Sequence, residues 1–173
     1  DVIYEARFEF KQNRDVSLGH RISDKLIPEL TGNRSVSTSA LSFCKQLSQD
    51  HKVICLSDYS CNQVKTVVAN HGLNVAPSWH SKASVLFFSR LHKTSGKLMS
   101  INMRTGKQNV ICSYDGLNMQ PSFSSDGSRA VLCMSARSGN SELYMYDQKI
   151  CRKLKKRVFV PLTSNNSSNS SPT

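Results

Sequence analysis

The sequence lacks a long hydrophobic run. None of its 173 residues belongs to a stretch near the roughly 18 consecutive apolar residues that a membrane-spanning helix needs. The first residues also lack the charged-then-apolar pattern of a secretory signal peptide. Because Asp1-Val-Ile-Tyr has the character of a strand interior, we expect the chain to begin partway through a larger protein. We expect it to be peripheral to a membrane and not to span one.

Catalytic motifs are missing too. The sequence has no G-x-S-x-G, no H-E-x-x-H and no phosphate-binding glycine loop. The five histidines are scattered, and their spacing does not match that of metal ligands on one element. Asp58, Asp115 and Asp126 recur in turn sequences, where an Asx side chain bonds its own backbone. We therefore expect no enzymatic activity, no cofactor and no metal site.

Acidic residues are few, with 12 Asp and Glu against 23 Lys and Arg and a net charge of +11. Such an excess would allow an anionic partner. Much of it lies in "KICRKLKKR" at 149–157, which contains no aromatic residue, whereas surfaces that bind nucleic acid often carry stacking rings. We predict a solvated loop or an edge-protecting hairpin there, and we expect no nucleic acid partner.

The six cysteines form no Cys-x-x-Cys motif, which argues against a zinc ribbon or a thioredoxin site. Several lie inside apolar runs such as "VIC" and "VLCM", where a thiol behaves as a small buried hydrophobe. We predict free thiols in the core. One or two disulfides stay open as an alternative if the compartment is oxidising.

What the sequence does contain begins with a short mixed segment. Residues 3–10 alternate apolar and polar, as a half-buried strand does. Leu18, Ile22, Leu26 and Leu30 recur every four residues and predict a helix that Gly32 ends with a left-handed cap, although the proline at position 28 should kink or shorten its last turn. We interpret residues 1–32 as the end of a small α/β domain and residues 33–39 as a linker.

From residue 40 to residue 173 the pattern changes to short strands separated by turns, with no helix-length periodic segment between them. Two stretches repeat the same order: "NVAPSWHSKASVLFFS" at 74–89 and "NMQPSFSSDGSRAVLCMS" at 118–135, offset by 44 residues. A period in the forties with four strands per unit is typical of a β-propeller blade. We predict a mainly β fold, an incomplete propeller with blades from about 40, 74 and 118 and the start of a fourth at 169.

The order of residues within the repeat has a physical explanation. Proline begins the innermost strand, where its missing N–H does little harm. The aromatic residue, Trp79 or Phe123, fills the gap between neighbouring blades, and Asp126-Gly127 makes a tight turn. The apolar run that follows is then a strand covered on both faces. Two consecutive repeats are therefore expected to form antiparallel meanders that lie side by side.

The repeat N-x-x-P-S-[WF]-S-x-D-G-S-[KR], followed by an apolar strand, resembles that of the TolB family, although several peptidase propellers share it. The flanks narrow the choice, because "GHRISDKLIPELTG" at 19–32 resembles the helix that closes that family's N-terminal α/β domain. The segment "ICLSDYSCNQVKTVV" at 54–68 is similar to the family's first blade. Departures are Cys61 in place of a turn glycine and His80-Ser81-Lys82-Ala83 in place of Ser-Pro-Asp-Gly.

The resemblance implies a docking site at the propeller mouth. In the TolB family, the loop that leads into each Pro-x-aromatic segment receives the peptidoglycan-associated lipoprotein Pal. The matching positions here are Asn74, Val75, Ala76, Leu117, Asn118, Met119, Gln120, Asn169, Ser170 and Ser171. The alternative stays open that these Asn and Ser residues only turn the chain. The N-terminal segment that engages TolA in the family is expected to be absent from this chain.

The resemblance thus implies a periplasmic, non-enzymatic docking component of the Tol-Pal system, with Pal and other Tol or outer-membrane proteins as partners. Two alternatives come from other classes of protein. The same repeats occur in the propeller that gates a prolyl-oligopeptidase-like serine peptidase. The basic charge would also suit a nucleic-acid-binding propeller, for which a steep salt dependence of DNA binding would be diagnostic.

Overall fold

The computed structural model describes residues 4–9, 15–81, 84–93, 95–135, 139–165 and 167–172. The chain divides into two compact units. The first, here called the helical unit, comprises Asp1–Leu41 and Leu56–Lys65; the second, the propeller unit, comprises Ser42–Cys55 and Thr66–Thr173. Neither described helix, α1 nor α2, is long and apolar enough to cross a membrane.

Helix α1 (Asp15–Thr31) confirms the predicted helix and its end. Gly32 has a φ of 69°, and its N–H donates to the Pro28 carbonyl at 2.8 Å, as expected of a left-handed C-terminal cap. Pro28 lies inside the helix. Because proline has no N–H, Pro28 cannot donate to the Asp24 carbonyl four residues earlier. The Asp24 side-chain carboxylate accepts from the Ser35 hydroxyl at 2.6 Å and from the Ser37 N–H at 2.8 Å. That carboxylate ties the segment after the helix back onto α1.

The predicted strand at 3–10 is wrong over the residues that the structure describes there. Residues 4–9 adopt no strand, and residues 3 and 10 lie outside the described part. The alternation of "YEARFE" supplies a face for a sheet, but a strand also needs a neighbouring strand to bond its backbone. The described residues 4–9 pair with none.

Strands β1 to β7 form one sheet, ordered β1-β2-β4-β5-β6-β7, with β3 paired to β2. The first group is β1 (Ala40–Ser48), β2 (His51–Asp58) and β3 (Val64–Val68). The second is β4 (Leu73–Trp79), β5 (Val85–Leu91), β6 (Gly96–Asn102) and β7 (Gln108–Cys112), an antiparallel meander. A single parallel pair, Lys52 with Leu73, joins the two groups.

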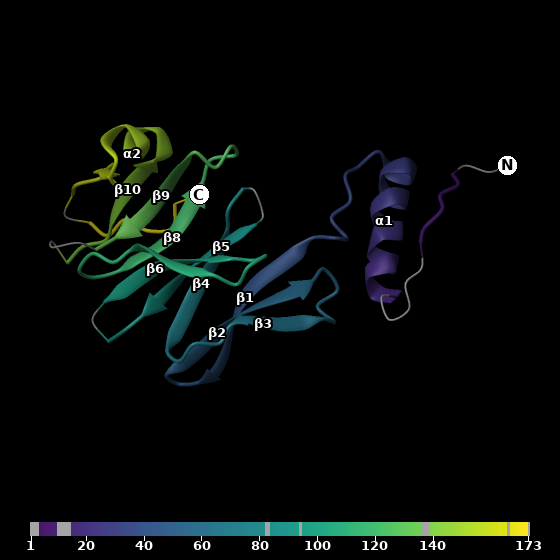
Figure 1. Ribbon diagram of the computed structural model, residues 1–173, viewed down its shortest axis with the longest axis horizontal. Helices are drawn as coiled ribbons and strands as arrows, with labels where there is room; N and C mark the ends of the chain where they lie inside the picture. Colours follow the sequence, from purple (N-terminus) through teal and green to yellow (C-terminus); the bar gives the residue numbers. More distant parts are fainter. Residues whose placement is uncertain are drawn as a thin grey trace. The chain divides into compact units, whose positions relative to one another are not determined.

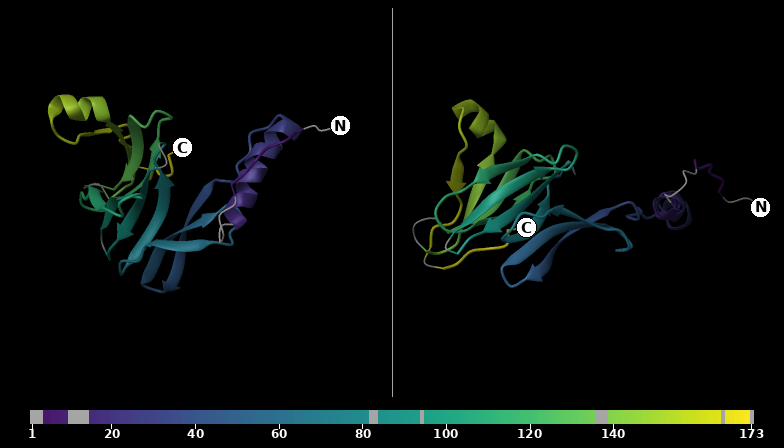
Figure 2. Two further views of the ribbon diagram at one scale, coloured as in Figure 1. Left: turned by 45° about the vertical axis from the view of Figure 1, so that its right-hand side comes forward. Right: turned by 60° about the horizontal axis from the view of Figure 1, so that its bottom comes forward.

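A second sheet, ordered β11-β10-β9-β8, repeats the meander. It consists of β8 (Asn118–Phe123), β9 (Arg129–Met134), β10 (Glu142–Asp147) and β11 (Phe159–Pro161). Strand β8 contacts β4, β5 and β6 of the preceding meander, so the predicted side-by-side arrangement is confirmed (Figure 1). Figure 2 shows the same two curved layers from other directions.

The basic stretch at 149–157 corrects two expectations. It is neither a loop nor a hairpin, because Gln148–Leu154 form the helix α2, and this helix interrupts the array of strands. The Asp147 side chain accepts from the backbone N–H groups of Lys149 and Ile150, which is the bond that an N-cap residue makes. Lys155 ends the helix in the left-handed conformation. The cap and a sequence of good helix formers outweigh the repulsion between the basic side chains.

The core of the propeller unit consists of the middle strands of each meander. Leu86, Phe88, Leu98 and Leu132 are almost wholly buried. All six cysteines are free, Cys44 and Cys61 being exposed and the other four buried, so the structure contains none of the disulfides left open above.

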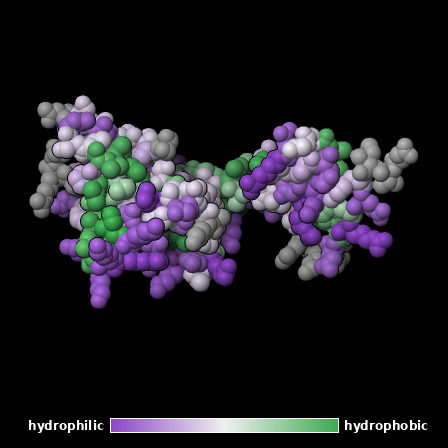
Figure 3. Space-filling view, turned by 90° about the horizontal axis from the view of Figure 1, so that it is seen from above, coloured by the Kyte–Doolittle hydropathy of each residue, from purple (hydrophilic) through white to green (hydrophobic). Residues whose placement is uncertain are grey.

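Figure 3 shows that one face of the propeller unit also presents an apolar patch beside hydrophilic side chains.

Candidate docking site

Three asparagines occupy equivalent places at the start of the innermost segments. The Asn74 side-chain amide donates to the carbonyls of Asn70 at 2.9 Å and Lys52 at 3.0 Å. The Asn118 amide makes the same two bonds, to Tyr114 and Gly96, both at 2.7 Å. Asn74 and Asn118 are fully buried. Each buried side-chain amide therefore holds its repeat's turn to the sheet, and we call this pair of hydrogen bonds the asparagine bracket.

This burial closes the side chains of Asn74 and Asn118 off from solvent, and a docking contact at these two positions stays a prediction. The burial favours, for these two residues, the alternative that they shape the chain. The third residue, Asn169, is half-buried, and its amide donates to the Asn165 side-chain oxygen at 2.9 Å and to the Glu142 carboxylate at 3.1 Å. Asn169 thus makes a related pair of bonds, in which the Asn165 side-chain oxygen and the Glu142 carboxylate take the places of the two backbone carbonyls.

Glu142 positions the last of the three segments. Besides Asn169, its carboxylate accepts from the Asn165 backbone N–H at 2.9 Å and from the Thr163 hydroxyl. These bonds, the Thr163 hydroxyl foremost, hold the pKa of Glu142 below its usual range. A charged carboxylate thus fixes the stretch that carries Ser170 and Ser171 against β10.

The residue two places after each asparagine has an unusual backbone. Ala76, Gln120 and Ser171 have φ angles of 51°, 54° and 56°, and a proline follows each of them. The strand register also shifts at the first two of these places. A residue with a side chain is less stable in the left-handed backbone conformation by about 1–2 kcal/mol. The three repeats therefore carry a similar backbone strain at the same position. Such bulges turn a side chain away from the regular face of a strand.

Hydrogen bonds join successive repeats along their innermost segments. The Ser78 hydroxyl donates to the Pro121 carbonyl at 2.9 Å. The Ser171 hydroxyl reaches the Gln120 side-chain oxygen at 3.4 Å. Gln120 and Ser171, which are 51 residues apart in sequence, therefore meet at one rim, which we call the mouth.

A hollow of about 500 Å³ adjoins the mouth residues. It is lined by Ser78, Trp79, Ser81, Pro121, Ser122, Phe123, Ser124, Ser125 and Pro172. The Trp79 indole N–H is buried without an acceptor among the described residues. From the sequence, the aromatic residues are expected to pack between blades, and the serines are not expected to line a site. The sequence signal that could have indicated these serines is the repeat itself, because Ser78 and Ser122 lie at equivalent positions in it.

The other predicted positions differ in exposure. Leu117 is 37% exposed, Ser170 and Ser171 are exposed, and Val75, Ala76, Met119 and Gln120 are half-buried. Ser170 and Ser171 also line an open hollow of about 620 Å³ beside β8, β9 and β10. Within the described residues, no three His, Cys, Asp or Glu side chains gather as metal ligands would. The mouth is thus built from neutral polar and small apolar groups.

The aromatic residues of the repeat lie where the two meanders meet. The rings of Phe87 and Phe123 approach to 4.7 Å between centroids, and His80 packs against Phe123 at 4.9 Å. The predicted role of Phe123 between blades is therefore confirmed. Gly127 makes the predicted tight turn with a φ of 70°, and its carbonyl lies 3.3 Å from His80 Nε2. The Lys82-Ala83 part of the first repeat's turn lies outside the described residues.

Four-stranded antiparallel meanders that repeat along the chain and pack side by side define a β-propeller. The family model of the TolB beta propeller domain matches residues 27–173. The chain belongs to this family.

Known relatives agree with the assignment. The chain is 26% identical over 150 residues to the Tol-Pal system protein TolB of Francisella tularensis subsp. mediasiatica. This match covers 83% of this chain and 34% of that protein. It is 26% identical over 125 residues to the TolB of Rickettsia prowazekii, covering 70% and 28%. The chain thus spans about a third of the length of the curated relatives that it matches.

Solved structures show the same fold. The crystal structure of TolB from Acinetobacter baumannii superimposes with a TM-score of 0.77 and 22% identity, over 94% of this chain and 39% of that one. The tricorn protease superimposes with a TM-score of 0.51 and 14% identity, over 75% and 12%. At these identities the likeness concerns the fold alone.

Proposed function

We propose that the chain is a non-enzymatic docking module of a Tol-Pal system, that it works in the periplasm, and that its mouth receives Pal. Membership of the TolB propeller family and the likeness to proteins named Tol-Pal system protein TolB support the system. The observation that carries the site is the repeated left-handed residue. Ala76, Gln120 and Ser171 spend backbone strain at the same place in three repeats.

Strain of this kind persists where the surrounding structure enforces it and a side chain has to be aimed. Here the enforcement comes from the buried asparagine brackets two residues earlier and from the prolines that follow. The brackets make the rim rigid before a partner arrives. A preorganised rim loses little conformational entropy when it binds, which favours affinity.

The chemistry of the mouth suits a peptide segment. Gln120 and Ser171 offer neutral donors and acceptors at one point of the rim, and Leu117 and Met119 offer apolar surface beside them. The hollow next to them, of about 500 Å³, has serine hydroxyls and two aromatic rings in its wall. An extended or turning segment of Pal could bury an apolar side chain there and bond its backbone to the rim.

The test is the affinity of the purified chain for the soluble domain of Pal from the same bacterium, measured by titration calorimetry. Gln120→Arg places a long charge at the mouth and should weaken binding at least about tenfold. Gln46→Arg makes the same change at an exposed position of β1 and should leave the affinity within about twofold. Both variants should keep the thermal unfolding transition of the parent chain.

Gln120→Gly separates the side chain from the backbone. It keeps the left-handed conformation without strain and removes only the side chain, so it should weaken binding while it preserves or raises stability. Unchanged Pal affinity in both Gln120 variants would contradict the site. Absence of any binding between the folded chain and Pal would contradict the partner.

A further inference from the structure

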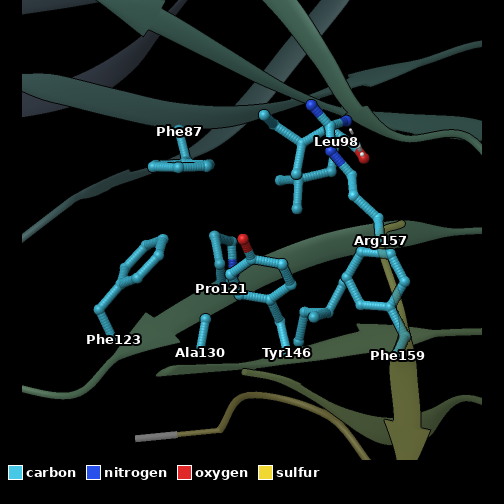
Figure 4. Close-up of a pocket in the computed structure, with 10 residues that line it drawn as sticks. Phe87, Leu98, Pro121, Phe123, Ala130, Tyr146, Arg157 and Phe159 are labelled. Atoms are coloured by element: carbon cyan, nitrogen blue, oxygen red, sulfur yellow. Dashed lines mark hydrogen bonds between the residues drawn. The ribbon is translucent and has the colours of Figure 1, made fainter. Parts of the chain in front are cut away.

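A second cavity lies inside the propeller unit, between the two meanders. It measures about 130 Å³; it shares Pro121 and Phe123 with the hollow beside the mouth, but neither Gln120 nor Ser171 lines it. Its lining residues are Phe87, Leu98, Ile111, Pro121, Phe123, Ala130, Leu132, Tyr146, Arg157 and Phe159. Figure 4 shows Phe87 and Leu98 on one wall, facing Phe123, Ala130 and the rings of Tyr146 and Phe159 on the other.

The cavity has an explanation in the repeat. Trp79 pairs with Leu86 across β4 and β5, and the equivalent pair 44 residues later is Phe123 with Ala130. Both members of the later pair are smaller. Where the first repeat has a Trp and a Leu, the second thus has a Phe and an Ala, and both of these smaller residues line the cavity.

The size and the walls of the cavity suit one aromatic ring. The Phe87 and Phe123 centroids lie 4.7 Å apart, and those of Tyr146 and Phe159 lie 5.9 Å apart. Burial raises the pKa of the Tyr146 phenol, as an apolar surrounding does. An engineered apolar cavity of about 150 Å³ in another protein holds benzene, and the cavity here, at about 130 Å³, is close to that size.

Arg157 gives the cavity a charged rim. Its Nη1 donates to the carbonyls of Val110 at 2.9 Å and Ile111 at 2.8 Å, which stretches the side chain from one meander to the other. The guanidinium is planar and has five N–H donors, and its remaining edge has the geometry that binds a carboxylate with two parallel bonds. Arg157 is exposed, so an anion can reach it from solvent.

A larger open hollow of about 220 Å³ continues beyond Arg157, lined by Ile111, Cys112, Ser113, Tyr114, Arg157 and Phe159. Arg157 and Phe159 therefore stand between an apolar chamber and a space that opens to water. Of the other charged groups that act on Tyr146, Arg152 is basic and Asp147 is held by Arg129 and by α2. Among the residues that line the cavity, the charged side chain is that of Arg157.

We propose that this cavity is a binding site for a small aromatic carboxylate, with the ring packed against the touching rings of Phe87 and Phe123 and the carboxylate on the Arg157 guanidinium. The walls select one flat ring by size, and the rim selects an acid over a neutral ring. This site does not depend on the docking function proposed above, because it shares neither Gln120 nor Ser171.

The experiment uses fluorine NMR of 4-fluorobenzoate, with fluorobenzene as the neutral ring, added to the complete chain. We expect 4-fluorobenzoate to bind in the millimolar range and to give nuclear Overhauser contacts to the rings of Phe87 and Phe123. Arg157→Gln should weaken 4-fluorobenzoate at least about tenfold and leave fluorobenzene unchanged, because it removes charged hydrogen bonds only. Lys153→Gln removes a charge from exposed α2 and should change neither.

Ala130→Leu restores the residue that the preceding repeat has at this point and should abolish binding of both compounds. If that variant does not fold, the contacts measured in the parent chain decide. The proposal is overturned if the folded parent chain does not bind 4-fluorobenzoate at 10 mM. It is equally overturned if Arg157→Gln binds it unchanged, if the contacts fall on other rings, or if a folded Ala130→Leu still binds it.

Discussion

Asn74 and Asn118 lie 44 residues apart in sequence and make the same pair of hydrogen bonds from the same fully buried position. Each side-chain amide reaches the carbonyl four residues earlier and a carbonyl 22 residues earlier, so each closes a turn and ties it to a neighbouring strand. The repeat thus preserves a bracket as well as a pattern of apolar residues. This bracket holds the bulge at the mouth.

Removal of one bracket should cost stability. We expect Asn118→Ala to lower the free energy of unfolding by about 3 kcal/mol, because it leaves buried carbonyls unpaired and opens a small cavity. Asn109→Ala removes the same groups from an exposed position of β7 and should change it by less than about 0.5 kcal/mol. Urea unfolding measures both. Equal costs would show that the buried amide is not what holds the turn.

Gly127 should tolerate no side chain. A Cβ added there would lie 2.5 Å from His80 Cε1 and 2.6 Å from Ser81 Oγ, and the φ of 70° disfavours any side chain. Gly106 has a similar φ of 72° but has no atom within 4 Å of such a Cβ. We expect Gly106→Ala to cost about 1 kcal/mol and Gly127→Ala clearly more. Thermal unfolding of the two variants gives the comparison, and a reversed order would contradict the packing of His80 on this turn.

The Asp126 turn should make stability depend on pH. Its carboxylate accepts from the Ser124 hydroxyl at 2.6 Å and from the Ser128 N–H at 2.9 Å, and these bonds, the Ser124 hydroxyl foremost, hold the pKa of Asp126 well below its usual range. The pKa is therefore lower in the folded chain than in the unfolded chain. Its stabilising contribution is present above the unfolded pKa of about 4 and is lost as the pH falls.

We expect the urea midpoint of the parent chain to fall between pH 7 and pH 3, and to fall less in Ser124→Ala, where the folded pKa lies closer to the unfolded one. Ser125→Ala changes the same turn without removing either serine that bonds Asp126, so its midpoint should fall as much as that of the parent. If the urea midpoint of Ser124→Ala falls with pH as much as that of the parent chain, Asp126 is not the source of the pH dependence.

The cap of α2 should matter more than its ion pair. Asp147 accepts from the Lys149 N–H at 2.8 Å and from Arg129 Nε at 3.1 Å, but the Arg129 side chain is 62% exposed. Asp147→Ala loses both partners and should cost about 1–2 kcal/mol, whereas Asp147→Asn keeps a capping oxygen and should cost only a few tenths. Chemical unfolding separates them. A similar cost for both variants would mean that the charge stabilises this region.

Much of the propeller could be predicted from the sequence, because its elements depend on local chemistry. Gly32 ended its helix and Gly127 made its turn as expected, since each supplies a left-handed conformation that the neighbouring pattern requires. The apolar runs of the two repeats became β5 and β9, whose residues are mostly buried or half-buried, because a short apolar run bounded by turn residues is typical of a covered strand. The domain boundaries at residues 32 and 39 stay predictions, as does the contact of the mouth with Pal.

The helix α2 and the strand expected at 3–10 show where local reading ends. A basic run supports either a hairpin or a helix, and the Asp147 cap decided between them. An alternating segment becomes a strand only beside a partner. The same limit applies to the site. The sequence located Asn74, Gln120 and Ser171, but it did not distinguish the buried asparagine that holds the turn from the two bulged residues at the rim.

The sequence by itself determined the period of the repeat, the order of residues within it and the turns that join its strands, because these follow from the preferences of each residue and its near neighbours. Only the tertiary structure decided which asparagines are buried, which bulged residues meet at the rim, and that Phe123 and Ala130 line a cavity with Arg157 at its rim. Those facts depend on contacts between residues 20 to 50 positions apart. Packing between repeats sets such contacts, and no single stretch of the chain encodes it.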